Sequence, residues 1–312
     1  MNQPLVSIIV ITYNSSKTIV ETLNSINEQT YENIELIISD DYSKDNTIEI
    51  CKDWIIKNKN RFTQIHIITS NQNTGISNNC NRGCKLAKGE WIKIIAGDDA
   101  LYSNAISELV KFSNKYPNAY IVHSKMKCYK DYFIETNIKP DLLQNYPPIL
   151  TNNQGNNSQK QYLLLSLGNH IGAVTVFMKR SLYKEVNGYD ESIKQCEDWP
   201  MWLKVTHLGY PFYFLDQYTS KYRISSSSVF GSATVNYLFS KFFEMENIIY
   251  NKYIKSSTPL IYRFTIRYYY YLRLCLDKMN LNKKNDITEF IYKLCKIPYL
   301  ILLKYLFKQL NK

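Results

Sequence analysis

Alternation of apolar runs with helical segments limits the possible folds of this chain more than any other feature. Four runs, at residues 5–11, 34–38, 65–69 and 91–95, are each long enough for one buried strand. Apolar residues recur at helical spacing between them, as in segment 19–26. Strands and helices that alternate in this way are typical of an α/β domain with a mainly parallel sheet.

Polar residues follow each of these predicted strands. In chain order they are Thr12 and Tyr13, Asp40 and Asp41, Asn73 to Gly75, and Asp98 and Asp99. Open α/β sheets bind ligands beyond the carboxyl ends of their strands, so we expect these residues to meet at one edge of the sheet. The glycine-rich signatures of dinucleotide and P-loop sites are absent, which argues against both kinds of site.

The fourth run, WIKIIAGDDA, ends in the adjacent carboxylates Asp98 and Asp99. Two acids at the end of a buried strand are costly unless a cation meets them. One interpretation is a divalent metal shared with substrate phosphates, because Mg²⁺ is often held by one or two carboxylates and a diphosphate. The other is a solvated loop whose acids cap the next helix. This stretch alone leaves both open.

Positive charge is concentrated in the last quarter of the chain. The whole chain has a net charge of +11; residues 236–312 contain 14 Lys and Arg against 5 Asp and Glu, whereas residues 1–235 contain 24 against 22. We therefore predict two parts, residues 1–230 and a basic helical region at 231–312. This asymmetry suggests an anionic partner for the tail, either a membrane surface or nucleic acid.

Apolar and aromatic residues in this tail fall at helical spacing among basic ones, which predicts three amphipathic helices at about 237–249, 261–276 and 287–310. Such helices suit an anionic membrane surface. They equally suit packing on the first domain with a basic face in water. No sequence motif of nucleic-acid recognition is present, so we expect no nucleic-acid partner.

Cysteine usage and hydropathy indicate a reducing, cytoplasmic environment. The seven cysteines are odd in number and form no C-x-x-C pair, which argues against a disulfide framework or a zinc site. We expect no signal peptide, because only a strand-length apolar run follows the N-terminus. No stretch approaches the roughly 20 apolar residues that a membrane span requires.

The second half of the first domain has a weaker pattern. Residues 129–158 show little periodicity and predict an insertion or a mobile loop. Glu197 and Asp198 begin a helix, with Asp198 as its expected N-cap. The other expected elements are a helix at 104–116, a strand at 119–127, a strand at 173–178, a helix at 179–186, short strands at 213–215 and 218–222, and a mobile segment at 223–228.

Six motifs together resemble family 2 glycosyltransferases. They are VSIIVITYN, SDDYSKDNT, NTGISNNCNRG, the strand ending in AGDD, NGYDES and CEDWPMWLKV, and they span residues 4–225 in the family's order and spacing. The resemblance implies the GT-A fold, a Rossmann-like α/β architecture. It also implies inverting transfer of a sugar from a nucleoside diphosphate donor.

Roles for individual residues follow from this resemblance. Thr12 and Tyr13 match the segment that lies along the nucleotide base. Asp40 and Asp41 match the acids that read the base and the ribose. The lining of the donor pocket is matched by two segments, Asn73 to Gly75 and Asn81 to Gly83. Asp98 and Asp99 match the metal motif, for Mn²⁺ or Mg²⁺, with Asp99 on the metal and Asp98 on ribose or the metal shell. Arg223 matches a phosphate contact.

The resemblance also places the chemistry at the start of the predicted 198 helix. Asp198 matches the catalytic base, and Glu197 lies beside it. Trp202 is expected on the acceptor side or in the core, and His170 is expected to face the acceptor. The chain departs from many members at Ala96, where a further acid often stands, and after Arg223, where a His is missing.

These features together predict addition of a single sugar, since the Gln-x-x-Arg-Trp signature of processive synthases is absent. The expected donor is a UDP-sugar. The expected acceptor is a hydroxyl of a lipid-linked glycan at the cytoplasmic face of the inner membrane, in surface polysaccharide assembly. The alternative is a non-catalytic subunit that binds nucleotide sugar or glycan.

Overall fold

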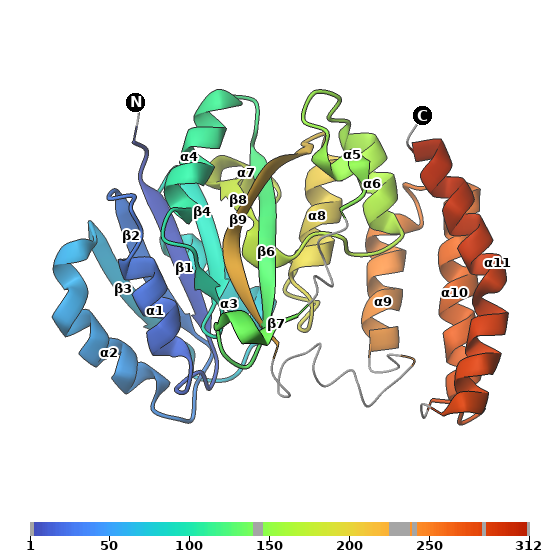
Figure 1. Cartoon of the computed structure of the whole chain (residues 1–312), viewed down its shortest axis with the longest axis horizontal. Helices are drawn as coiled ribbons and strands as arrows, with labels where there is room; N and C mark the ends of the chain where they lie inside the picture. Colours follow the sequence, from blue (N-terminus) through green and yellow to red (C-terminus); the bar gives the residue numbers. More distant parts are fainter. Residues whose placement is uncertain (1–2, 140–145, 225–237, 239–241, 283–284, 311–312) are drawn as a thin grey trace.

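A computed structural model describes residues 3–139, 146–224, 238, 242–282 and 285–310. A nine-stranded mixed sheet runs through the first domain in the order β3-β2-β1-β4-β8-β6-β9-β5, and β7 pairs with β6 at the side. Helices cover both faces of this sheet, and the C-terminal helices stand at the end opposite α2 (Figure 1). The predicted α/β class with a helical C-terminal region is confirmed.

The first half follows the predicted alternation closely. Parallel pairing joins β1 to β2 and β4, and β2 to β3. The elements of this half are β1 (Val6–Thr12), α1 (Ile19–Asn27), β2 (Ile34–Asp40), α2 (Thr47–Asn58), the short helix η1 (Lys59–Arg61), β3 (Gln64–Thr69), α3 (Ile76–Leu86) and β4 (Trp91–Ala96).

Alternation of side chains along β1 explains why its sequence is a continuous apolar run. Successive residues of a strand point to opposite faces. Ile8 and Val10 pack with α1 and α2, whereas Ile9 and Ile11 pack with α3 and the helices beyond it. Both faces of the strand are therefore buried, as in other sheets covered by helices on both sides.

The second half mixes strand directions. Antiparallel pairs join β8 to β4 and to β6, while β6 and β9 run parallel. Its elements are β5 (Ala100–Leu101), α4 (Ala105–Lys115), β6 (Ile121–Lys130), η2 (Glu135–Asn137), β7 (Ile138–Lys139), α5 (Pro148–Thr151), α6 (Ser158–Ser166), η3 (Ala173–Thr175), β8 (Phe177–Lys179), α7 (Arg180–Glu185), α8 (Asp198–His207) and β9 (Phe212–Ile224).

Several sequence-based expectations are wrong in this half. The interval 129–158 contains the end of β6, β7 and α5 rather than a plain loop; residues 140–145 lie outside the described part. The 173–178 run opens with the 3-10 turn η3, and β8 is only its end. The two short strands are one strand, β9, whose register shifts opposite Lys125.

The described part of the C-terminal region contains three helices, as predicted. They are α9 (Phe243–Ile249), which continues into the π-turn η6 (Tyr250–Ile254), α10 (Leu260–Lys278) and α11 (Asp286–Leu310). The expected start of the first helix, from 237, falls largely on residues outside the described part. In the described ranges no helix combines the length and apolar character needed to cross a bilayer.

These helices share the core of the first domain. Ile249, Ile254 and Leu306 are at most 1% exposed and belong to the same apolar cluster as Trp202 and Phe212. Packing on the first domain, one of the two interpretations of the tail, is therefore what the described helices do. The boundary at residue 230 lies outside the described part and stays a prediction.

Candidate active site

The ends of β1 and β2 are joined by hydrogen bonds around Asp40. The Thr12 hydroxyl donates to the Asp40 carboxylate at 2.8 Å, and the Ser43 amide donates to its other oxygen at 2.8 Å. The Asp41 amide donates to the Thr12 carbonyl. Asp40 is only 1% exposed. The ends of β1 and β2 therefore converge as predicted, and hydrogen bonds to Asp40 link them.

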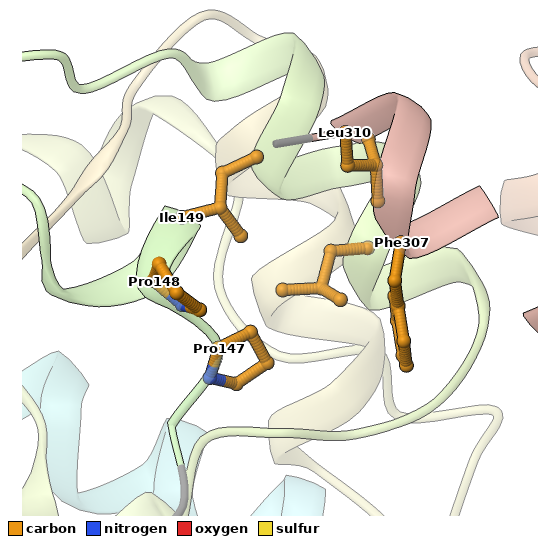
Figure 2. Close-up of a pocket in the computed structure, with 6 residues that line it drawn as sticks. Pro147, Pro148, Ile149, Phe307 and Leu310 are labelled. Carbon is orange, nitrogen blue, oxygen red and sulfur yellow. The ribbon is translucent and has the colours of Figure 1, made fainter. Parts of the chain in front are cut away.

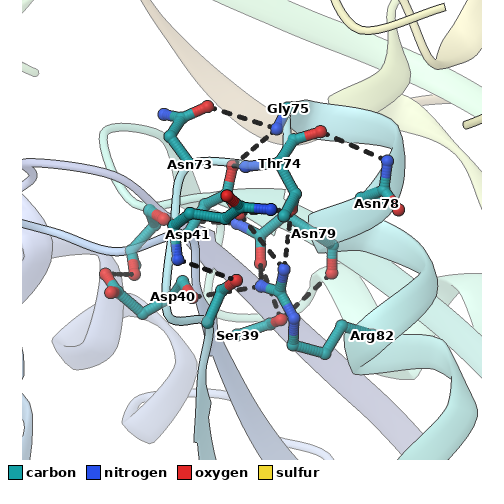
Figure 3. Close-up of polar contacts among 12 residues, drawn as sticks. Ser39, Asp40, Asp41, Asn73, Thr74, Gly75, Asn78, Asn79 and Arg82 are labelled. Carbon is teal, nitrogen blue, oxygen red and sulfur yellow. Dashed lines mark hydrogen bonds and ion pairs between the residues drawn. The ribbon is translucent and has the colours of Figure 1, made fainter. Parts of the chain in front are cut away.

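Asp41 holds the segment that precedes α3 (Figure 3). Its carboxylate accepts from the amides of Thr74 and Gly75 at 2.9 and 2.8 Å, and from the Thr74 hydroxyl. Gly75 has φ +89°, a conformation that glycine adopts without strain. The sequence alone placed Asp41 on the nucleotide, and the structure adds this positioning of the loop.

Arg82, which no sequence signal assigned to Asp41, completes this cluster. Its guanidinium lies 3.1 Å from Asp41 and also donates to the Thr74 hydroxyl, the Asn79 side chain and the Asp40 carbonyl. Arg82 is on the face of α3 that packs toward β2. The motif from Asn81 to Gly83 had placed Arg82 only in the lining of the donor pocket.

Asp98 and Asp99 occupy the turn after β4, beside the end of β9. Asp99 is 3% exposed, and one of its oxygens accepts the Arg223 amide at 2.9 Å. Asp98 is half-buried, and its carbonyl accepts from the Arg223 guanidinium at 2.7 Å. Burial first, and then the Asp98 charge, raise the pKa of Asp99 well above its usual range.

Arg223 is buried rather than part of a mobile segment. It belongs to β9, and its guanidinium also contacts Glu21 on α1 and the carbonyl of Asp131. It thereby ties three separate segments to the Asp98–Asp99 turn. Contact with a donor phosphate stays a prediction for this residue. Residues 225–228 of the expected mobile segment lie outside the described part.

Lys93 is a buried cation within β4 that the sequence analysis did not consider. Its side chain is fully buried, and its ammonium group donates to the carbonyls of Val174 and Val176. These bonds join β4 to η3 and to Val176, the residue that follows it. Burial lowers the pKa of Lys93 to about 7, and the Asp99 charge opposes that shift.

The predicted base, Asp198, is the first residue of α8. Its side chain accepts from the Asn169 amide at 2.7 Å and from the Trp199 backbone at 2.7 Å. The helix N-cap is Glu197 rather than Asp198, so the expected capping role is wrong. The contact with Asn169 was invisible in the sequence because 29 residues separate the two.

Burial and mutual repulsion perturb this pair of acids. Burial first, and then the charge of Asp198, raise the pKa of Glu197 to about 8. Burial also raises the pKa of Asp198, against the opposing hydrogen bonds from Asn169 and Cys196. Adjacent carboxylates with raised pKa values are a feature of sites that move protons.

Tyr222 is a partly buried phenol near the end of β9. Burial raises its pKa, and the negative charges of Asp99, Asp98 and Asp198 add to the shift. That the metal motif and the expected base belong to one site stays a prediction.

The remaining predicted residues are divided between surface and core. Tyr13 is 49% exposed at the end of β1, where a base can reach its ring. Trp202 is 1% exposed and packs edge-on against Phe212, so it lies in the core rather than on an acceptor surface. His170 is half-buried, and its ring packs against Phe307 of α11.

Comparison with known proteins agrees with this arrangement. The family model described as glycosyl transferase family 2 matches residues 7–186, more than half of the chain. The chain belongs to glycosyl transferase family 2. It is therefore a glycosyltransferase by family, and the motifs that predicted the family lie on the strand ends described above.

Two relatives match over most of the family 2 domain. WfaP of Escherichia coli, a UDP-Glc:alpha-D-GlcNAc-diphosphoundecaprenol beta-1,3-glucosyltransferase, is 30% identical over 72% of this chain and 79% of its own length. EpsE of Bacillus subtilis, a putative glycosyltransferase, is 26% identical over 72% of this chain and 75% of its own.

Solved structures share the fold at low identity. A fragment of S. aureus TarS in complex with UDP-GlcNAc superposes with a TM-score of 0.62 at 21% identity, covering 86% of this chain and 72% of the fragment. The mannosyltransferase PcManGT of Pyrobaculum calidifontis, in complex with GDP-Man and Mn²⁺, gives 0.55 at 16% identity, covering 98% and 70%. These likenesses support the GT-A architecture.

Proposed function

We propose that this family 2 enzyme transfers one sugar, with inversion, from a UDP-sugar to a hydroxyl of a lipid-linked glycan. The observation that carries the proposal is Asp198, a carboxylate with a raised pKa that Asn169 orients at the start of α8. Inversion requires the acceptor hydroxyl to attack the anomeric carbon opposite the leaving diphosphate. A carboxylate within hydrogen-bond reach accepts the proton of that hydroxyl.

Glu197 assists the base by remaining protonated and therefore uncharged. Because burial and the Asp198 charge raise its pKa to about 8, Glu197 is mostly neutral at pH 7 and adds no negative charge beside Asp198. A neutral neighbour leaves Asp198 free to accept the acceptor proton. If Glu197 were the base instead, it would have to be ionised, and its ionised form predominates only above about pH 8.

Tyr13, Thr12 and the Asp40–Asp41 pair are proposed to bind the nucleotide. The exposed Tyr13 ring suits stacking on a base. Asp40 and Asp41 are already accepting several hydrogen bonds, so each offers only its remaining acceptor capacity to base or ribose. Support for a UDP-linked donor comes from WfaP and from TarS, whose names state UDP-Glc and UDP-GlcNAc.

A divalent metal, Mn²⁺ or Mg²⁺, fits the chemistry of the Asp98–Asp99 turn. Across the described ranges no group of three or more His, Cys, Asp or Glu side chains gathers to hold a metal. Two carboxylates with a substrate diphosphate are nevertheless a common set for Mg²⁺. When bound, the ion would neutralise charge on the leaving diphosphate. Asp99 and Asp98 would hold it, while Arg223 keeps their turn in place.

We also propose that α11 lies on the cytoplasmic face of a membrane. Its outer stripe consists of apolar side chains spaced three or four residues apart, each 47% to 71% exposed: Ile287, Phe290, Leu294, Ile297, Ile301 and Tyr305. Exposed lysines accompany this outer stripe, at Lys304 and Lys308. An apolar face flanked by lysines is the pattern of helices that lie on anionic bilayers.

Asp198→Asn tests the chemistry. We expect transfer to fall by at least a thousandfold, because the acceptor proton loses its base, while binding of the UDP-sugar is unchanged. The measurements are single-turnover transfer to a lipid-linked glycan and titration of UDP-sugar, each with Mn²⁺ and with EDTA. Near wild-type transfer by the variant would refute the base, and full transfer in EDTA would refute the metal.

A non-catalytic binding subunit is the second candidate, and Ala96 with the missing His after Arg223 are its support. Slow hydrolysis of the UDP-sugar by water separates the two candidates without knowledge of the acceptor. An enzyme hydrolyses its donor slowly in a base-dependent manner, whereas a binding subunit leaves the donor intact.

A further inference from the structure

An apolar cavity lies where the end of α11 meets the segment before α6. Its volume is about 200 Å³, and all of its lining residues are apolar: Pro147, Pro148, Ile149, Leu164, Phe307 and Leu310. Figure 2 shows side chains of these two segments facing the same space. An apolar cavity of about 150 Å³ stays dry and binds a molecule such as benzene. This cavity therefore has room for one small hydrocarbon group.

One short segment links the cavity with the proposed base, Asp198. Asn169 donates to Asp198 at 2.7 Å, and the following residue, His170, packs its ring edge-on against Phe307 at 6.4 Å between centroids. Phe307 in turn lines the cavity. Two neighbouring residues of one loop thus contact the base on one side and the cavity wall on the other.

His170, which contacts the cavity wall, is uncharged at neutral pH, because burial lowers its pKa to about 4. Two cations lie close to the cavity on the outer surface of α11, where Lys304 and Lys308 are exposed within one turn of Phe307. Neither lysine forms an ion pair with any residue that the structure describes. An ammonium group is a point charge suited to phosphate.

We propose that this cavity binds the first branched unit of the hydrocarbon chain of the lipid-linked acceptor. The inference rests on the proposed function and extends it. With a sugar hydroxyl at Asp198, the hydrocarbon enters between Ile149 and Phe307, and the phosphate linker faces Lys304 and Lys308. The enzyme then distinguishes a lipid-linked glycan from the same glycan free in water.

Geranyl phosphate is a suitable probe, because it combines two branched units with one phosphate. Its binding is measured by calorimetry below its micelle concentration, on the full chain saturated with UDP so that the donor site is occupied. Inorganic phosphate serves as the probe without hydrocarbon. Ile149→Trp fills the cavity, and Leu208→Trp adds the same side chain at an exposed position on the end of α8, as the matched control.

We expect wild type and Leu208→Trp to bind geranyl phosphate at least tenfold more tightly than inorganic phosphate. Ile149→Trp is expected to lose that preference and to keep UDP binding. Leu310→Trp, which fills the same cavity from α11, replaces Ile149→Trp if the latter fails to fold by circular dichroism. Equal binding of geranyl phosphate by wild type and the filled variants overturns the cavity proposal. Absence of UDP binding by wild type overturns the proposed function instead.

Discussion

Asp41 illustrates how a residue expected on the ligand also organises the protein. It has four hydrogen-bond donors around it, from Thr74, Gly75 and Arg82. Buried carboxylates require such partners, because an uncompensated charge in the interior is expensive. The same bonds hold the loop before α3 in the shape that the donor pocket needs. The Asp41 side chain is therefore expected to serve both nucleotide binding and the stability of the fold.

Arg82→Ala should destabilise the fold by about 3 kcal/mol, because the nearly buried Asp41 loses its cation and Thr74 loses a donor. Arg82→Lys should rescue little of this, since one ammonium group cannot replace the planar fork. Urea unfolding measures the change. Lys85→Ala, at an exposed position of the same helix, is the control and should stay within about 0.5 kcal/mol of wild type.

Glu197→Gln should leave the acid limb of the pH–rate profile at the same pH. Burial and the Asp198 charge raise the pKa of Glu197 to about 8, so Glu197 is neutral where the acid limb lies and does not repel Asp198. Activity requires ionised Asp198 and is lost as pH falls through its raised pKa. The profile of kcat/KM between pH 5 and 9 gives the result. An acid limb displaced to lower pH in the variant would show that Glu197 is charged in the wild type.

Glu197→Gln should also raise the stability of the folded protein, and the gain should grow with pH. Between pH 4.5 and about 8 the folded protein retains the Glu197 proton, which the unfolded chain has released. This carboxyl therefore costs stability increasingly as pH rises through that window. The melting temperature of Glu197→Gln should exceed that of wild type by more at pH 8 than at pH 5.

Among the secondary-structure elements, α11 has two faces with different tasks. Tyr299, Leu306 and Leu310 are buried against the rest of the molecule, whereas the outer stripe is exposed. Pro298 lies inside the helix and is exposed, so its missing N–H removes one helical hydrogen bond. A contiguous exposed apolar surface of this length is unusual for a monomer and marks an interaction site.

Leu294→Gln combined with Ile301→Gln should weaken binding to vesicles with anionic lipid by about a hundredfold. Fully burying such a side chain is worth about 2 kcal/mol, and only the 57% of Leu294 and 64% of Ile301 that is exposed can add to binding, so the pair contributes about 2.5 kcal/mol. Folding is spared because both side chains are more than half exposed. Vesicle co-sedimentation measures the partition. Leu208→Gln, an exposed leucine on α8, controls for loss of a surface leucine and should leave binding unchanged.

At the scale of the whole molecule, the C-terminal helices complete the core. The Tyr162 hydroxyl donates to the Tyr253 carbonyl, and Lys252 forms an ion pair with Asp190 at 2.6 Å. Together with the shared apolar cluster, these contacts make the tail part of the folded unit. Deletion is therefore a poor test of membrane binding, because it removes packing as well as the outer stripe.

A chain ending at residue 235 should be destabilised by several kcal/mol, since Ile249, Ile254 and Leu306 each leave a buried site. Soluble yield and the melting temperature compare it with the full chain. Equal melting temperatures for the two would show that the tail is an independent unit, and the boundary at residue 230 would then divide two domains.

Local sequence patterns predicted the family, the alternation of the first half and most of the acids of the candidate site. Apolar runs and helical periodicity depend on neighbours within one element, and such local patterns are legible in one dimension. Tyr13, Asp40, Asp41, Asp98, Asp99 and Asp198 were identified because short motifs contain them.

The partners of these acids depend on how the elements pack in three dimensions. The pairs Asn169–Asp198, Arg82–Asp41 and Glu21–Arg223 are 29, 41 and 202 residues apart in the chain. Trp202 lies in the core, and Lys93 is buried beside η3, for the same reason. Burial and long-range hydrogen bonding depend on the packing of several elements at once, and no local pattern in the chain encodes them.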